Sequence, residues 1–249
     1  INEFIIVVGY LGEKIKEKLG DGGKYKAKIT YVQNEEWDKG NGVSVLKAKD
    51  LLKKERFFLL MSDHVFDVKI LKELKREKLK EDESILVVDK APRKYIDLED
   101  ATKVIIRGNY IQDIGKEIKD YNGVDCGIFL LSPLIFEALE ESIKANDETL
   151  SGGIRILAKS GKMKAFDVKG QFWMDIDTKK NIVEAEKNLC ESLKKPTDGP
   201  ISKYLNRVIS TRLSRILAKT DIKPNLISFF SFFLSLLSAF FFSFGSYFH

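Results

Sequence analysis

Along the first 195 positions, short apolar runs alternate with charged stretches of helical periodicity. Runs of four to six apolar residues are too short for buried helices and are typical of strands, whereas apolar residues three and four apart predict amphipathic helices. The first such unit is a strand over Phe4–Val8 followed by a helix over Leu11–Leu19. Repetition of this unit predicts a doubly wound α/β sheet. The other predicted strands are Lys28–Val32, Phe57–Met61, Ser84–Asp89, Val124–Leu131, Lys162–Val168 and a hairpin of Thr102–Arg107 with Tyr110–Ile114, and the other helices are Gly42–Lys53, Asp67–Lys80, Pro133–Ala145 and Lys179–Lys194.

Two aspartates follow predicted strands and are candidates for a metal site. The uninterrupted run Phe57–Met61 predicts a strand buried on both faces of a parallel sheet, which places Asp63 at the carboxyl end where open α/β sheets bind ligands. Asp63 is suited either to a divalent ion or to capping the next helix. Asp177 is placed to cap the helix that starts at Lys179, which leaves Asp175 without a structural task. Asp63 and Asp175 could together hold one hard divalent ion against a nucleotide phosphate.

Two further features are suited to a nucleotide and a phosphorylated substrate. In the loop Lys39-Gly40-Asn41-Gly42, the glycines allow the backbone to approach a flat base and Asn41 offers it a donor and an acceptor. A turn before a helix explains this loop equally well. Lys116 ends the predicted hairpin, where its ammonium could meet a substrate phosphate. His64 and His249 are the only histidines, which excludes a Ser/His/Asp triad and a histidine-based zinc site; His64 reads as a hydrogen-bonding residue at a strand end rather than a base.

The C-terminal part has a different pattern. Pro196–Pro200 has the composition of a linker. Ile201–Lys219 predicts a basic helix suited to anionic head groups, with a merely solvated helix as the alternative. Leu226–Phe248 is an uncharged apolar stretch longer than the roughly 20 residues that cross a hydrocarbon core. It predicts a membrane span, with a buried core helix as the alternative. Because the basic residues precede it, the positive-inside rule predicts a cytoplasmic location for residues 1–225.

Composition narrows the possible functions. The chain is 44% hydrophobic and 32% charged, as expected of a folded protein. Only 6 of its 42 basic and 2 of its 37 acidic residues lie after position 195, so the globular part is nearly neutral. Nothing in its charge favours the binding of nucleic acid. Cys126 and Cys190 lack metal-site spacing and predict a reducing compartment. The chain starts at Ile1 without an initiator Met and ends close to an apolar run, so we expect a longer protein.

Several motifs together resemble a known family. They are Lys39-Gly40-Asn41-Gly42, Met61-Ser62-Asp63-His64, Ile114-Gly115-Lys116, Val124-Asp125-Cys126-Gly127-Ile128-Phe129 and Trp173-Met174-Asp175-Ile176-Asp177-Thr178. This order resembles that of sugar-phosphate nucleotidyltransferases, and most closely the bifunctional inositol-1-phosphate cytidylyltransferase/di-myo-inositol-phosphate-phosphate synthases. In the tail, the segments Ile201-Ser202-Lys203, Asn206-Arg207, Ile209–Arg212 and Pro224-Asn225 resemble the entry into the CDP-alcohol phosphatidyltransferase membrane domain of that fusion.

The resemblance implies a fold and an activity. The fold would be a Rossmann-like three-layer sandwich over 1–195, incomplete at its N-terminus, then a linker and basic helix over 196–225 and a first transmembrane helix over 226–249. The reaction would be cytidylyl transfer from CTP to inositol 1-phosphate, giving CDP-inositol for the membrane half to join to another inositol phosphate. By resemblance, the residues would act as follows: Asp63 and Asp175 bind Mg²⁺; Lys39, Gly40, Asn41 and Asp63 bind the nucleotide; Lys116, Asp89 and Asp125 bind the polyol phosphate; Asp63, Lys116 and Asp175 are catalytic.

The sequence also departs from the family pattern. The first strand and its Gly-rich phosphate loop would precede Ile1, and the metal-binding motif of the membrane half is absent. We therefore expect residues 1–249 alone to catalyse neither reaction. Two alternatives stay open: a nucleotidyltransferase for another sugar or polyol phosphate, and an inactive, membrane-tethered nucleotide-binding module.

Overall fold

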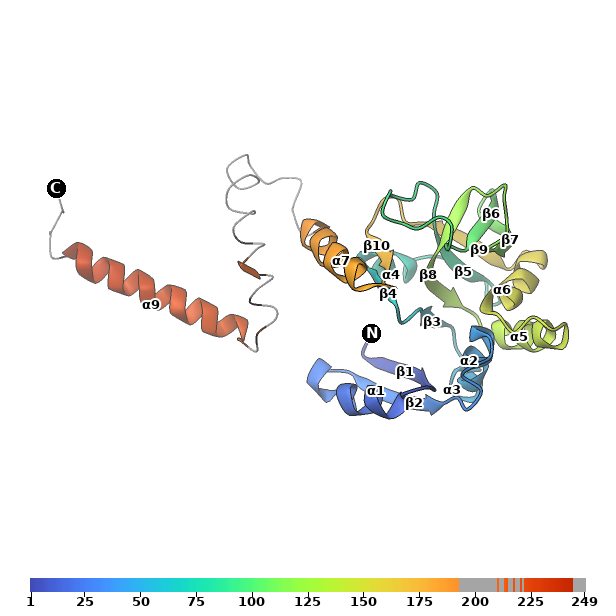
Figure 1. Ribbon diagram of the computed structural model, residues 1–249, viewed down its shortest axis with the longest axis horizontal. Coiled ribbons are helices and arrows are strands. Elements are labelled where there is room, and N and C mark those ends of the chain that lie inside the picture. Colours follow the sequence, from blue (N-terminus) through green and yellow to red (C-terminus); the bar gives the residue numbers. More distant parts are fainter. Residues whose placement is uncertain (193–209, 211–212, 215–216, 218–219, 221, 244–249) are drawn as a thin grey trace. The chain divides into compact units, whose positions relative to one another are not determined.

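The computed structural model describes residues 1–192, 210, 213–214, 217, 220 and 222–243 (Figure 1). They belong to two compact units, Ile1–Asn181 and Ile182–His249. The predicted linker over 196–200 and most of the predicted basic helix over 201–219 lie outside the described residues. The fold can therefore be described for each unit by itself.

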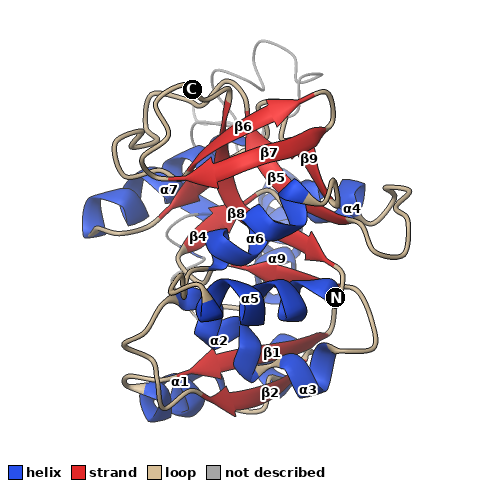
Figure 2. Cartoon of the chain, turned by 90° about the vertical axis from the view of Figure 1, so that its right-hand side faces the viewer, coloured by secondary structure: helices blue, strands red, loops and turns tan. Residues whose placement is uncertain are grey.

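The first unit is built on a mixed six-stranded sheet of strand order β3-β8-β5-β9-β7-β6, in which β8 also pairs with β6. Strand β5 pairs with β9 in parallel, and the other pairings are antiparallel. Two smaller sheets, parallel β1-β2 and antiparallel β4-β10, complete the unit, with β1-β2 set apart from the large sheet (Figure 2). The strands are β1 Glu3–Val8, β2 Lys28–Gln33, β3 Phe57–Leu60, β4 His64–Phe66, β5 Ser84–Asp89, β6 Lys103–Arg107, β7 Tyr110–Gly115, β8 Gly123–Leu131, β9 Met163–Asp167 and β10 Trp173–Asp175.

Side chains of the central strand β5 alternate between two cores, because successive residues of a strand point to opposite faces. Leu86 and Val88 join a core with residues of α2 (Asn41–Lys47), α5 (Leu134–Lys144) and α6 (Leu150–Lys159). Ile85 and Val87 join a second core with Ile70 and Leu74 of α4 (Lys69–Leu74). Helices therefore cover both faces of the sheet, which confirms the predicted three-layer α/β sandwich.

The run Phe57–Met61 was predicted to be a strand buried inside a parallel sheet, and this prediction of its surroundings was wrong. Strand β3 pairs with β8 alone among the described strands, and it does so antiparallel rather than parallel. Phe57 is buried, but Phe58, Leu59 and Leu60 are only partly buried, as suits an edge strand. An apolar run reports that a strand is apolar on both faces but carries no information on the direction of its partner.

Helix α6 was not predicted. Its first turn contains Gly152 and Gly153, and glycine is among the weakest helix formers. Both glycines are required by packing, since a Cβ on Gly153 would lie 2.7 Å from Leu139 Cδ2 and one on Gly152 would lie 2.1 Å from Ser142 Oγ. The helix is stabilised by tertiary contacts that local propensity does not report.

Most of the other elements follow the predictions, several of them with shifted boundaries, whereas β4, β10 and the 3-10 helix η1 were not predicted. The hairpin of β6 and β7 turns at Gly108, whose φ of 58° suits glycine. The predicted helix over 42–53 is divided at Ala48 into α2 and α3. The helix expected from Lys179 is present, but its described cap is the Thr178 hydroxyl, which accepts a hydrogen bond from the Asn181 N–H at 3.2 Å, and not Asp177. The other helices are α1 Gly12–Leu19, the short 3-10 helix η1 Gly23–Tyr25, α3 Lys49–Leu52 and α7 Lys179–Ser192.

In the part of the second unit that the structure describes, the long apolar helix is α9 (Pro224–Ser243). Its segment Asn225–Ser243 has 19 residues and a mean hydropathy of 2.1, so it is long and apolar enough to cross a membrane. Large apolar side chains such as Phe232 and Leu234 are more than 60% exposed. Exposure of this kind suits a lipid environment better than water.

Candidate active site

The structure brings Asp63 and Asp175 to adjacent positions. Strands β4 and β10 pair with Asp175 opposite His64, and the Ile176 N–H donates to the Asp63 carbonyl at 2.8 Å. Burial raises the pKa of Asp175, and the neighbouring carboxylates of Asp177 and Asp63 raise it further. A divalent cation at this point would relieve that repulsion. The two residues therefore meet as the sequence predicted, although through a small antiparallel pair rather than at the edge of a parallel sheet.

His64 fixes the carboxylate of Asp63. Its Nδ1 lies 2.7 Å from Asp63 Oδ1, and its side chain is only 14% exposed. The ring stacks on Trp173 with centroids 6.1 Å apart and planes 14° apart. The ring also lies close to Gly127, where a Cβ would be 2.5 Å from His64 Cδ2. The imidazole thus acts as a packed, hydrogen-bonded support, as expected from its place at a strand end.

The two aspartates predicted to bind the polyol phosphate differ in their surroundings. Asp89 is 4% exposed, and its carboxylate accepts hydrogen bonds from Trp173 Nε1 at 2.7 Å and from the Ala91 N–H at 2.9 Å. Both bonds are internal to the chain. Burial raises the pKa of Asp125 to about 6, against the lowering effects of a hydrogen bond from the Gly127 N–H and of nearby His64. Asp125 is therefore protonated more readily than a free aspartate.

The loop of Gly40 and Asn41 packs against the segment before α6. A Cβ on Gly40 would lie 2.3 Å from the Glu148 carbonyl oxygen, so close backbone packing already requires this glycine. The Leu150 N–H donates to Asn41 Oδ1 at 2.8 Å. Asn41 is exposed, and its Nδ2 has no hydrogen-bond partner among the described residues. The acceptor Oδ1 of Asn41 is therefore already bound within the chain, whereas its donor Nδ2 is available to a base.

The two predicted lysines are both held in ion pairs. Lys39 lies 2.5 Å from Glu36, which also pairs with Lys47, and hydrogen bonds from these two lysines lower the pKa of Glu36 to about 2. Lys116 follows β7 and lies 2.5 Å from Asp100, with both side chains more than half exposed. Exposed pairs of this kind are weak, so a phosphate can displace the carboxylate. Within the described residues, no hydrogen bond or ion pair joins either lysine to Asp63 or Asp175.

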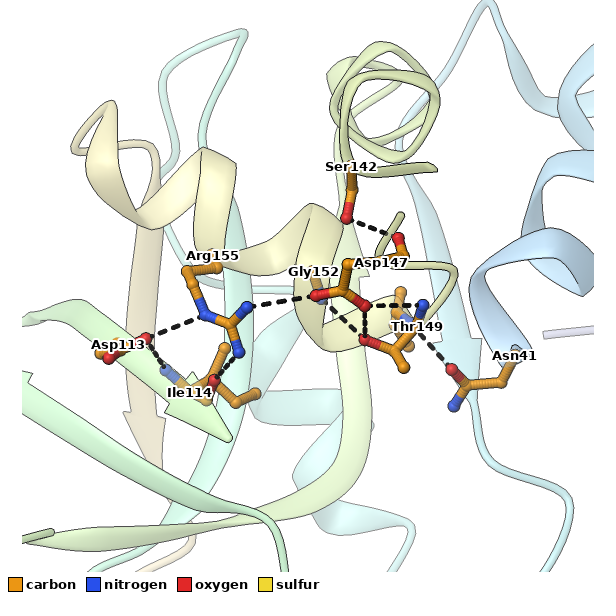
Figure 3. A network of polar contacts seen from close by, with 9 residues as sticks. Asn41, Asp113, Ile114, Ser142, Asp147, Thr149, Gly152 and Arg155 are labelled. Carbon is orange, nitrogen blue, oxygen red and sulfur yellow. Dashed lines mark hydrogen bonds and ion pairs between the residues drawn. The ribbon is translucent and has the colours of Figure 1, made fainter. Parts of the chain in front are cut away.

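Sequence reasoning missed a polar network that surrounds the start of α6 (Figure 3). Arg155 bridges Asp113 and Asp147, and Thr149 caps the helix by accepting from the Gly152 N–H at 3.1 Å. The available signal was the acceptor pattern Asp147 and Thr149 directly before an apolar stretch, which is typical of a helix start. The two following glycines obscured it.

The fold and the paired aspartates define a class of protein. A family model described as nucleotidyl transferase matches residues 1–192, so the chain belongs to the nucleotidyl transferase family. Members of this family generally use a divalent metal ion.

Individual relatives make the comparison more specific. Over 96% of its length, the chain is 36% identical to the bifunctional IPC transferase and DIPP synthase of Aquifex aeolicus and 34% identical to that of Archaeoglobus fulgidus. It spans 53% and 46% of these proteins, about half the length of the curated relatives that it matches. The inositol-1-phosphate CTP transferase from T. maritima superposes with a TM-score of 0.64 and 27% identity, covering 78% of this chain and 80% of that one. The predicted resemblance to the bifunctional family is confirmed.

Proposed function

We propose that the whole protein containing this chain transfers a cytidylyl group from CTP to inositol 1-phosphate. The observation that supports this most directly is the meeting of Asp63 and Asp175 on a nucleotidyl transferase fold whose relatives are named for this chemistry. A phosphate oxygen of inositol 1-phosphate attacks the α-phosphorus of CTP. The bond from this phosphorus to the bridging oxygen breaks, and pyrophosphate leaves with the electron pair. The products are CDP-inositol and pyrophosphate.

Asp63 and Asp175 are proposed to hold Mg²⁺. Among the described residues, no group of three or more His, Cys, Asp or Glu side chains is arranged to hold a metal. Two carboxylates fit Mg²⁺ nevertheless, because this ion takes one or two of them and completes its shell with phosphate oxygens and water. The ion would neutralise charge on the phosphates of CTP. Asp63 and Asp175 would orient it, and His64 would hold Asp63 in place.

The other roles follow from position and charge. Asn41 Nδ2 is suited to donate to an acceptor on the cytosine edge, with Gly40 and Lys39 beside it. Lys116 would exchange Asp100 for the phosphate of the incoming inositol phosphate. Asp125 and Asp89 are proposed to position that substrate, Asp89 indirectly, because its carboxylate already binds Trp173.

The second half of the activity is proposed for the membrane. The helix α9 would span the bilayer, with residues 1–225 in the cytoplasm because the basic residues lie on that side. The whole protein would then condense CDP-inositol with a second inositol phosphate, as the naming of the relatives as DIPP synthases supports.

The test measures pyrophosphate release by the whole purified protein with CTP and Mg²⁺. Inositol 1-phosphate is expected to support turnover and glucose 1-phosphate to be a poor substrate. Asp63→Asn is expected to lower kcat/KM by roughly 100-fold or more, because a neutral amide stabilises the metal and the developing charge poorly. Asp50→Asn is the matched control, since Asp50 lies on α3 with a side chain 90% exposed. Turnover of neither substrate, or equal effects of the two variants, would contradict the proposal.

A further inference from the structure

The N-terminal half of α6 lies between two segments that the proposed function assigns to the substrates. On one side, the Leu150 N–H donates to Asn41 Oδ1 at 2.8 Å, and the Gly42 N–H donates to the Glu148 carbonyl at 3.0 Å. On the other side, Arg155 Nη2 donates to the carbonyl of Ile114 at 2.7 Å, two residues before Lys116. One short helix thus contacts both the loop expected to meet the base and the strand that leads to the phosphate lysine.

The guanidinium of Arg155 makes the connection between these sides (Figure 3). Its Nε lies 3.1 Å from Asp113 Oδ1 and its Nη1 lies 3.2 Å from Asp147 Oδ2. Asp113 belongs to β7, whereas Asp147 belongs to the turn between α5 and α6. A planar guanidinium presents its donors in a rigid fork, so it fixes the distance between its partners in a way that a lysine cannot.

Asp147 carries the connection on to the helix start. Its Oδ1 accepts from both the N–H of Thr149 at 3.0 Å and the hydroxyl of Thr149 at 2.6 Å. The Ser142 hydroxyl donates to the Asp147 carbonyl at 2.7 Å. Leu150, which holds Asn41, is the next residue after Thr149. Asp147 is therefore linked through Thr149 to the residue that contacts Asn41.

The charges around Arg155 favour a role in positioning these segments over a role in binding phosphate. Its single positive charge lies between two carboxylates, Asp113 and Asp147, so the cluster has no surplus positive charge to attract an anion. Three of its donor contacts are already made within the chain. The side chain is only about a third exposed.

We propose that Arg155 is a positioning residue that sets the separation between Asn41 and Lys116, and hence between the sites for the cytosine and for the polyol phosphate. The inference rests on the proposed function, which assigns Asn41 to the cytosine and Lys116 to the polyol phosphate. The link itself is a property of the fold and can be measured without turnover.

The first experiment measures backbone hydrogen exchange in the whole protein and in its Arg155→Met variant. Loss of the bridge is expected to speed exchange about tenfold in both segments 39–42 and 113–118, and to leave the central strand 84–89 unchanged. Arg76→Met, an exposed arginine just after α4, is the matched control and is expected to change none of the three. Faster exchange in only one segment, or in neither, would overturn the proposal. If Arg155→Met does not fold, Arg155→Lys is measured in its place, because it keeps the charge and loses the fork.

The second experiment is a double-mutant cycle on kinetics. Arg155→Met is expected to lower kcat/KM roughly 10- to 100-fold, since a misplacement of about 1 Å between reacting groups has effects of this size. In a Lys116→Ala or an Asn41→Ala background the same change is expected to cost clearly less, because residues that act through one another are not additive. A merely structural Arg155 would lower the thermal midpoint and give additive effects, which would overturn the proposal. A wild-type protein without turnover would instead contradict the proposed function, and the exchange experiment would still decide the role of Arg155.

Discussion

At the scale of single residues, a chain of contacts links the core to the candidate metal ligands. The buried carboxylate of Asp89 accepts from Trp173 Nε1, and the Trp173 ring stacks on His64. His64 in turn contacts the carboxylate of Asp63. The position of Asp63 thus depends on residues that touch no ion. Supporting contacts of this kind orient metal ligands in many proteins and are costly to remove.

Gly127 is expected to be essential to this support. It has a φ of 67°, and a Cβ would collide with the His64 ring. Gly127→Ala is predicted to destabilise the protein by more than the roughly 1 kcal/mol of a positive φ alone. It is also predicted to weaken the binding of Mg²⁺, because Asp63 is displaced. Gly161→Ala is the matched control, because Gly161 has a φ of 66° and nothing within 4 Å of its Cβ position. Equal losses in thermal midpoint for the two variants would refute the role of the His64 contact.

Asp125 is expected to give stability a distinct pH dependence. Its folded pKa of about 6 lies above the ordinary value of 3.8, so the folded state favours the protonated acid. The stability that this provides is complete below pH 3.8 and is lost as the pH rises through about 6, by an amount on the order of 3 kcal/mol. Asp125→Asn should therefore gain thermal midpoint relative to wild type between pH 4 and pH 7. A constant difference across that range would contradict the prediction, and Asp50→Asn is expected to show such a constant difference.

At the scale of elements, α6 shows how a helix can be stabilised against its own propensity. Its two glycines are unfavourable in a helix, but they allow close contact with α5. The Thr149 side chain accepts a hydrogen bond from the Gly152 N–H in the first turn. Because this cap also contacts Asp147, the start of the helix and the Arg155 bridge are coupled.

Removal of the cap tests this coupling. Thr149→Ala is predicted to lower the free energy of unfolding by about 1 kcal/mol through the lost cap, and further because Asp147 loses a donor. Thr149→Ser keeps the hydroxyl and should remain near wild type. Chemical unfolding measures both, and a Thr149→Ser variant as unstable as Thr149→Ala would show that the methyl packing, not the hydroxyl, matters.

The element-scale predictions succeeded where a pattern was strong and local. The strand Ser84–Asp89 has every residue buried and was predicted with its exact bounds. The hairpin of β6 and β7 was predicted from its glycine turn. The setting of β3 and the existence of α6 were not predictable, because the partner of a strand and the packing of a glycine are decided by distant residues.

At the scale of the whole molecule, the apolar helix α9 contrasts with the first unit. Its exposed phenylalanines and leucines would be unfavourable in water, whereas a bilayer accepts them. The proposal of a membrane-tethered enzyme depends on this helix.

A charge in the middle of α9 tests the tether. Leu234→Arg is predicted to disfavour insertion by roughly 2.5–3.5 kcal/mol. Residues 1–249 should sediment with membranes after an alkaline wash, whereas the Leu234→Arg variant should move largely to the supernatant. Leu234→Ile serves as the matched apolar control and should stay with the membranes. Recovery of the unmodified chain in the supernatant would contradict the tether.

The sequence by itself determined the alternation of strands and helices and the apolar tail, and it marked Asp63 and Asp175 as candidate metal ligands, because each of these depends on residues close together in the chain. Only the tertiary structure decided that these aspartates meet through β4 and β10, that Asp89 is held by Trp173, and that Arg155 joins Asp113 to Asp147. These contacts join segments between 8 and 112 residues apart. Hydrophobic periodicity reports which face of an element is buried, and it carries no information on which distant polar side chain lies opposite.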